Sequence, residues 1–171
     1  MTRYRIVPEQ SKVWIDARSN VHPIRSSMDG LEGYVELTME DAGTVDLSAP
    51  PAGTVSLPVT RLSSGNRFED RELHKRLAAR RFPTIKGVLT AIERADGEGR
   101  YHVSGNVAFR GVIRPCRDEM TVTVVDPHTL RFDGESTFDI RDFGMEPPRI
   151  LMLKVEPDVV VRVDIVAEIE R

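Results

Sequence analysis

The sequence predicts an all-β protein, an antiparallel barrel or sandwich with one α-helix. Three observations support this prediction. Apolar and polar residues alternate over at least eight segments, which is typical of strands with one buried face. Short stretches containing Gly, Pro, Asn or Asp separate these segments and favour turns. Only one segment, at about residues 66–80, has a helical pattern, so strands do not alternate with helices as they do in α/β proteins.

The overall composition is that of an ordinary globular protein. The length of 171 residues suits one domain, residues 1–171, with a sizeable core. The net charge of −3 gives no indication of a nucleic-acid partner. Cys116 is the only cysteine, which excludes an intrachain disulfide. No apolar run is long enough to span a membrane and the first residues do not form a secretory signal, so we expect a cytoplasmic protein.

Prolines interrupt the predicted strands in the first half of the chain. Pro8 ends the first strand, and Pro23 breaks the polar segment 20–28, which we expect to be a loop or a bent strand. Pro58 lies within the segment 54–62 and indicates an edge position or a bulge. The strands predicted in this half are 4–7, 12–19, 31–37 and 54–62, with a further edge strand considered at Val45 and Leu47.

The predicted helix, at about residues 66–80, has suitable residues at both ends. Asn66 or Ser64 can cap its N-terminus by accepting hydrogen bonds from free backbone N–H groups. Acidic residues follow in the first turns and arginines gather at the end, which matches the helix dipole. The apolar stripe of this helix consists of Phe68, Leu73 and Leu77.

A long hairpin follows the helix, and the rest of the chain is organised around it. Its strands, 84–93 and 101–109, flank a glycine-rich turn. Gly87 and Gly105 are weak strand residues, so we expect each to mark a bend or a close contact in a curved sheet. The second strand alternates clearly and places on one face Tyr101, Val103, Gly105, Val107 and Phe109.

The last third of the chain contains three long alternating strands. We predict them at 112–125, 130–140 and 159–169, with a loop between the last two in which Gly144 takes positive φ and Phe143 is buried. Within that connection, residues 151–154 are either helical or extended. Common faces are predicted for Met120, Val122 and Val124, and for Leu130, Phe132, Gly134, Ser136, Phe138 and Ile140. A sheet of such long strands tends to curl, and closing it into a barrel removes its edges.

Three segments then occur in a characteristic order. They are the helix from Asp70 to Arg81 running into Phe82-Pro83-Thr84-Ile85, the hairpin ending at Phe109-Arg110-Gly111, and Phe138-Asp139-Ile140-Arg141-Asp142-Phe143-Gly144. Together they resemble the YceI-like family of lipocalin-like, polyisoprenoid-binding proteins over nearly the whole chain. The resemblance implies an extended antiparallel lipocalin-like barrel, a helix beside or over one end, and a long apolar pore. It also implies a bound long-chain isoprenoid or similar amphiphile, and a homodimer in several members.

From these observations we expect a non-enzymatic carrier of a long-chain isoprenoid, quinone or similar amphiphilic lipid, with no cofactor and no metal. Burial of such a chain contributes about 0.8 kcal/mol per CH₂ group. The residues expected to line the cavity are Val88, Val107, Phe109, Val122, Phe132, Phe138, Phe143 and Met145. The sequence leaves open whether these side chains surround a cavity or fill the barrel completely.

Four arginines are candidates for binding an anionic head group at the barrel mouth. They are Arg76, Arg80, Arg81 and Arg110. The simpler interpretation is a solvated helix end whose positive charges match the helix dipole. Both interpretations remain open from the sequence.

Two other functions are considered. An enzyme could use the barrel as a reaction chamber, with His102, Asp142 or His74 as its acid or base. A module without a ligand would have a filled barrel and an exposed apolar dimer face. The histidines lie far apart in the sequence and form no spacing typical of a metal site, and Cys116 has no neighbours typical of a nucleophile.

Overall fold

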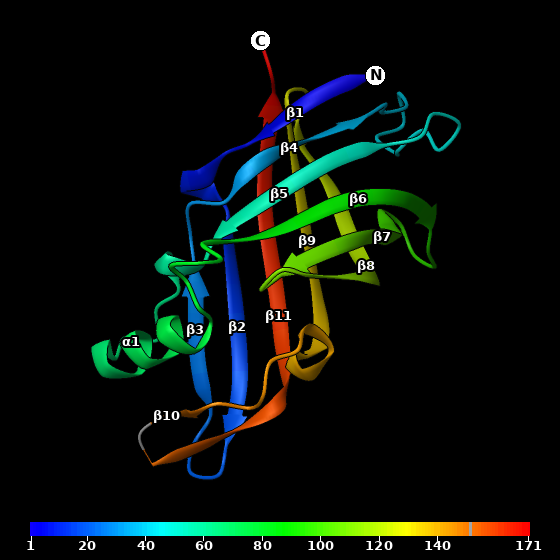
Figure 1. Ribbon diagram of the computed structural model, residues 1–171. Coiled ribbons are helices and arrows are strands. Elements are labelled where there is room, and N and C mark those ends of the chain that lie inside the picture. Colours follow the sequence, from blue (N-terminus) through cyan, green and yellow to red (C-terminus); the bar gives the residue numbers. More distant parts are fainter. Residues whose placement is uncertain (151) are drawn as a thin grey trace.

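The computed structural model describes residues 1–150 and 152–171, and within them eight antiparallel strands form a closed barrel (Figure 1). The last strand pairs with the first and closes the ring. The all-β prediction is therefore confirmed, and the barrel is correct rather than the sandwich. In ring order the strands are β1 (Thr2–Ile6), β4 (Glu32–Leu37), β5 (Ala52–Pro58), β6 (Thr84–Arg94), β7 (Arg100–Phe109), β8 (Val112–Asp126), β9 (Thr129–Asp139) and β11 (Leu153–Ile169).

A second hairpin extends the barrel wall along β11. It consists of β2 (Lys12–Ser19), which pairs with β11, and β3 (Ile24–Met28), which pairs with β2. Of the segment 20–28, residues 20–23 are irregular as expected, whereas residues 24–28 form a regular strand. Its polar Ser26 is buried, but the hydroxyl Oγ donates a 3.0 Å hydrogen bond to the Ile15 carbonyl oxygen. Because this bond satisfies the hydroxyl, a polar residue is tolerated at an inward strand position.

A short strand, β10 (Arg149–Ile150), folds back onto the beginning of β11. Of the segment 151–154, Leu151 lies outside the described residues. Leu153 and Lys154 are extended and belong to β11. The last strand therefore begins six residues before the predicted position at Val159.

Of the two predicted caps, Asn66 rather than Ser64 caps the helix α1 (Arg67–Arg76). The Asn66 side-chain oxygen accepts hydrogen bonds from the backbone N–H groups of Phe68 and Glu69, at 3.0 and 3.2 Å. The helix is shorter than predicted because the chain leaves it near Ala78, where φ is +51°. The predicted apolar stripe is wrong at Phe68, which is 70% exposed.

Two other predictions needed correction. Val45 and Leu47 do not form an edge strand, since Val45 makes an isolated bridge in a loop that turns into the core. The fourth predicted strand ends at Pro58, and residues 59–61 form a 3₁₀ turn, because proline has no N–H group to continue the ladder. Val124 keeps the predicted face, since it pairs with Leu130 as Val122 pairs with Phe132, but unlike Val122 it is exposed.

The glycine predictions for the central hairpin are confirmed. A Cβ atom at Gly105 would lie 2.6 Å from the Val88 carbonyl oxygen, and one at Gly87 would lie 3.0 Å from the Val55 side chain. The register between β6 and β7 shifts between Leu89 and Ala91. Close contacts and an irregular register are both typical of strongly curved sheets.

The barrel interior has two parts. The end near the chain termini is packed with buried side chains, and α1 lies toward the opposite end (Figure 1). Between them the inward-facing side chains surround an open space. We call the packed part the filled end, and define it by Tyr4, Leu37, Val45, Tyr101 and Leu130.

Candidate functional site

A cavity of about 430 Å³ occupies the barrel between the filled end and α1. This volume lies in the range of roughly 300–1,000 Å³ that is typical of small-molecule sites. The lining is almost entirely apolar and comes mainly from strands on all sides of the barrel. Many lining side chains are only partly buried although they point inward, because they border empty space instead of other side chains. Examples are Ile15, Leu57, Ile85, Phe109, Val161 and Val163.

The helix contributes to the wall of the cavity through Leu73 and Leu77. Two contacts fix its position. The His74 ring Nε2 lies 2.8 Å from the Leu62 carbonyl oxygen, and the Asp70 carboxylate accepts hydrogen bonds from the N–H and hydroxyl groups of Ser64, at 2.8 and 2.7 Å. These bonds attach the helix to the segment that precedes it. His74 therefore has a structural contact.

Three aromatic side chains from three different elements meet at the border of the cavity. The ring centroid of Phe143 lies 5.5 Å from that of Phe109 and 6.4 Å from that of Phe138. Phe143 belongs to the 3₁₀ turn after β9, and Gly144 follows it with φ of +70°. This turn confirms the prediction for both residues, and it also buries Met145 against the cavity.

The barrel wall has a seam between β8 and β9, which is the stretch where these neighbouring strands do not pair. Strand β8 pairs with β7 from Val112 onward, but its pairing with β9 begins only at Met120, opposite Gly134. The cavity at this height is bordered by Glu119 and Glu135, which are both exposed. No strand pairing between β8 and β9 therefore closes the barrel wall beside this part of the cavity.

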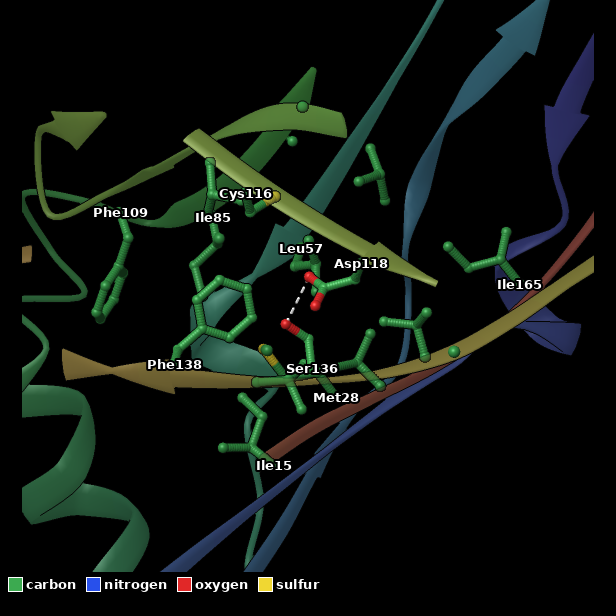
Figure 2. Close-up of a pocket in the computed structure, with 18 of the residues that line it drawn as sticks. Ile15, Met28, Leu57, Ile85, Phe109, Cys116, Asp118, Ser136, Phe138 and Ile165 are labelled. Atoms are coloured by element: carbon green, nitrogen blue, oxygen red, sulfur yellow. Dashed lines mark hydrogen bonds between the residues drawn. The ribbon is translucent and has the colours of Figure 1, made fainter. Parts of the chain in front are cut away.

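A polar pair faces the cavity at the same seam. The Ser136 hydroxyl donates a 2.7 Å hydrogen bond to Oδ2 of Asp118 (Figure 2). Cys116 lies two residues earlier on the same face of β8 and also lines the cavity. Burial, and secondarily the charge of Asp118, raise the pKa of the Cys116 thiol. The thiol is therefore held in its neutral form.

The alternation in the sequence places Ser136 on the same face as Phe132 and Phe138, but it does not single out Asp118. A signal was present, because the alternation of Met120 and Val122 continues backward to Asp118 and Cys116. An acidic residue within an otherwise apolar face interrupts that pattern. It was therefore not recognised as part of the same face.

The structure places all eight residues expected to line the cavity at its border. They do not contribute equally. Val88 is 41% exposed and alternates with the half-buried Gly87 and Leu89, so its side chain belongs to the outer face of β6. The other members, Val107, Phe109, Val122, Phe132, Phe138, Phe143 and Met145, are half-buried or buried. Their contact with a ligand stays a prediction.

None of the four candidate head-group arginines borders the cavity formed by the described residues. Arg76 donates a 3.4 Å hydrogen bond to the Arg149 carbonyl oxygen, and Arg80 is exposed. Arg81 lies over the Phe82 ring, 5.2 Å from its centroid. Arg110 donates a 3.1 Å hydrogen bond to the carbonyl oxygen of the turn glycine after Phe143. Their role in binding an anionic head group stays a prediction.

The three candidate acid or base groups also lie away from the cavity. His102 is opposite Glu93 and Glu119 on neighbouring strands, and Asp142 is exposed. His74 makes the contact with the Leu62 carbonyl group. Within residues 1–150 and 152–171, no group of His, Cys, Asp and Glu side chains is arranged to hold a metal ion. No helix in the part of the chain that the structure describes is long and apolar enough to cross a membrane.

Comparisons with known proteins agree with this architecture. A model of the YceI-like domain matches residues 4–167. BcnA from Burkholderia cenocepacia is similar in structure, with a TM-score of 0.78, 18% identity, and coverage of 94% of this chain and 98% of BcnA. A polyisoprenoid-binding domain from Saccharophagus degradans, implicated in plant cell wall breakdown, has a TM-score of 0.80, 12% identity, and coverage of 99% and 100%.

A YceI protein from Campylobacter jejuni is a more distant structural match, with a TM-score of 0.66, 12% identity, and coverage of 86% of this chain and 85% of that protein. At these identities the structural matches show the fold. No curated protein matches the sequence.

Proposed function

Since this chain belongs to the YceI-like family, we propose that it is a non-enzymatic binding protein for a long-chain isoprenoid, quinone or similar amphiphilic lipid. The observation that supports this function is the apolar cavity of about 430 Å³, which lies beside a stretch where two neighbouring strands of the barrel do not pair. The similar domain from Saccharophagus degradans is described as polyisoprenoid-binding. An apolar chain in the cavity would contact Phe109, Phe138 and Met145.

Burial of apolar surface supplies sufficient affinity for such a ligand. Each buried CH₂ group contributes about 0.8 kcal/mol, so about ten of them contribute roughly 8 kcal/mol. Ordering a flexible chain and restricting its motion reduce this value. A net gain of about 8 kcal/mol corresponds to a Kd near 1 μM, so a longer buried chain would offset the ordering cost.

The positions of the candidate acid and base groups favour binding over catalysis. His74, His102 and Asp142 do not border the cavity, so none is placed to transfer a proton to a ligand inside it. General acid–base catalysis requires hydrogen-bond reach between the catalytic group and the reacting atom.

Native mass spectrometry of gently purified protein tests the proposed function. We expect a stoichiometric adduct, and organic extraction should release an isoprenoid, quinone or lipid that accounts for its mass. A clean apo mass, together with no uptake from an added panel of long-chain isoprenoids, quinones and lipids, would contradict the proposal. The same spectra measure the oligomeric state, for which we propose a homodimer.

A further inference from the structure

We propose that Asp118 and Ser136 form a selective polar site inside the cavity, which favours amphiphiles with a neutral hydroxyl group over amphiphiles with an anionic head. Alcohols and hydroquinones carry such a hydroxyl, whereas phosphates and carboxylates are anionic. This inference rests on the proposed binding function and specifies its ligand class.

The geometry of the pair leaves hydrogen-bonding capacity for a ligand. An ionised carboxylate accepts up to about four hydrogen bonds. Among the described residues, the Ser136 hydroxyl is the hydrogen-bond donor to the Asp118 side chain, at 2.7 Å. Asp118 lies on the wall of the cavity, where its carboxylate faces otherwise apolar side chains (Figure 2). Since a polar group in an apolar environment is costly without partners, a ligand that donates a hydrogen bond there is favoured.

The charges around the cavity disfavour an anionic head. Among the described residues, the cavity lining presents the carboxylate of Asp118 and no Lys, Arg or His, and the exposed Glu119 and Glu135 place two more carboxylates on the outer face beside the seam. Arg100 is 3.1 Å from Glu119 and offsets part of that charge at the surface. Asp118 has no such ion pair among the described residues. Like charges that share a site of low dielectric repel each other strongly.

The position of this polar pair differs from that of the four arginines, and the two candidate head-group sites predict opposite selectivity. The arginines lie outside the cavity and would bind phosphate or carboxylate. The Asp118–Ser136 pair lies within it, at the seam where β8 and β9 do not pair. A hydroxyl bound at the seam leaves the apolar chain free to extend among the aromatic rings.

Three isoprenoids of equal chain length test the proposal: farnesol, farnesyl phosphate and the hydrocarbon farnesene. Cys116 provides the readout, since it is the only cysteine and lines the cavity. A bound ligand should slow its alkylation, and the concentration that halves the rate measures affinity. We expect farnesol to act at a concentration about tenfold lower than either of the other two, which corresponds to one hydrogen bond to a charged group.

The variant Asp118→Asn removes the charge while keeping the size of the side chain. We expect it to reduce the preference for farnesol over farnesyl phosphate about tenfold. The control is Glu93→Gln, which makes the same chemical change on the outer face of β6, where Glu93 pairs with Arg117 at 3.2 Å. Rates are normalised to the ligand-free rate of each protein, because Asp118 also affects the thiol. Circular dichroism checks that both variants are folded.

The outcomes separate the two proposals. If farnesyl phosphate protects Cys116 as well as farnesol does, in the unmodified protein, the selective site is wrong and the carrier function stands. The same conclusion follows if Asp118→Asn leaves the preference unchanged. If none of the three isoprenoids slows alkylation, the carrier function fails for this ligand class and the selective site fails with it. The comparison in the unmodified protein decides the question even if Asp118→Asn does not fold.

Discussion

The filled end and the cavity are built on the same strands, yet one is solid and the other is hollow. At the filled end, Leu37 and Leu130 are at most 2% exposed. Around the cavity, Ile85 and Phe109 point inward as well but are only partly buried. Alternation therefore determines which side chains face inward. Whether these side chains fill the barrel or leave a cavity depends on their sizes and on the loops that enter it.

Two features account for the difference. The loop between β4 and β5 turns Val45 into the filled end, where its N–H group donates a 2.9 Å hydrogen bond to the Tyr101 hydroxyl. Around the cavity, inward positions on three strands are occupied by glycine, at Gly87, Gly105 and Gly134. Because glycine has no side chain, these three positions leave the space beside them unfilled.

The largest expected effect is the loss of ligand binding when a charged side chain is placed in the cavity. Phe138→Arg should reduce ligand retention below detection, because an apolar chain cannot offset the cost of the buried guanidinium. Native mass spectrometry of the folded variant measures it. Val88→Arg is the control, because Val88 belongs to the outer face, and it should retain the ligand. Unchanged retention in Phe138→Arg would remove Phe138 from the binding site.

The next effect is on stability and compares the two parts directly. Leu130→Ala should lower the free energy of unfolding by about 3 kcal/mol, because it creates a void in the filled end. Ile85→Ala should lower it by only about 1 kcal/mol, because Ile85 already borders empty space. Urea unfolding of the ligand-free proteins measures both. Equal losses would show that the two parts do not differ in packing.

A smaller effect is expected for the hydrogen bond that holds the loop in the filled end. Tyr101→Phe should lower the free energy of unfolding by about 1–2 kcal/mol, because the buried Val45 N–H group loses its acceptor. Tyr34→Phe serves as the control, since the Tyr34 ring stacks with Arg3 and the replacement keeps the ring. Urea unfolding measures both, and an equal small loss in the two variants would show that the Tyr101 hydroxyl contributes little.

The smallest effect concerns the chemistry of the hollow part. Because burial and then the charge of Asp118 raise the pKa of Cys116, its alkylation rate should keep rising at pH values where an ordinary thiol has levelled off. The raised pKa also sets the sign of the effect on stability, because folding favours the neutral thiol. This stabilising contribution is fully present below the ordinary thiol pKa and is lost as the pH rises through the raised pKa. A rate profile that levels off at the ordinary thiol pKa would contradict a buried environment.

Much of the fold could be predicted from the sequence because its signals are local. The strict alternation from Leu130 to Ile140 predicts which residues of β9 share a face, and Asn66, one of two candidate caps, marks the start of the helix. The strand Ile24–Met28 was missed as a regular strand because its buried serine depends on a hydrogen bond to another strand. Such a partner cannot be identified from the segment itself.

The site was predictable to a lesser extent. Aromatic residues such as Phe109 and Phe138 could be assigned to the interior, but the seam depends on where two strands stop pairing. The pairing stops at Met120 and Gly134, which lie inside their strands, so no turn residue in the sequence marks this position. The exposure of Phe68 could not be predicted either. The spacing of apolar residues along a helix does not show how much of that helix the barrel covers.

The 17-residue strand β11 has a consequence for synthesis of the protein on the ribosome. It pairs with β1, β2, β9 and β10, and it leaves the ribosome after all four of them. Until Leu153–Ile169 has emerged, the hairpin of β2 and β3 has no neighbour along β2, and the barrel cannot close. Until then the nascent chain exposes apolar faces of these strands, and a chain that stalls before Leu153 leaves four strands without their common partner.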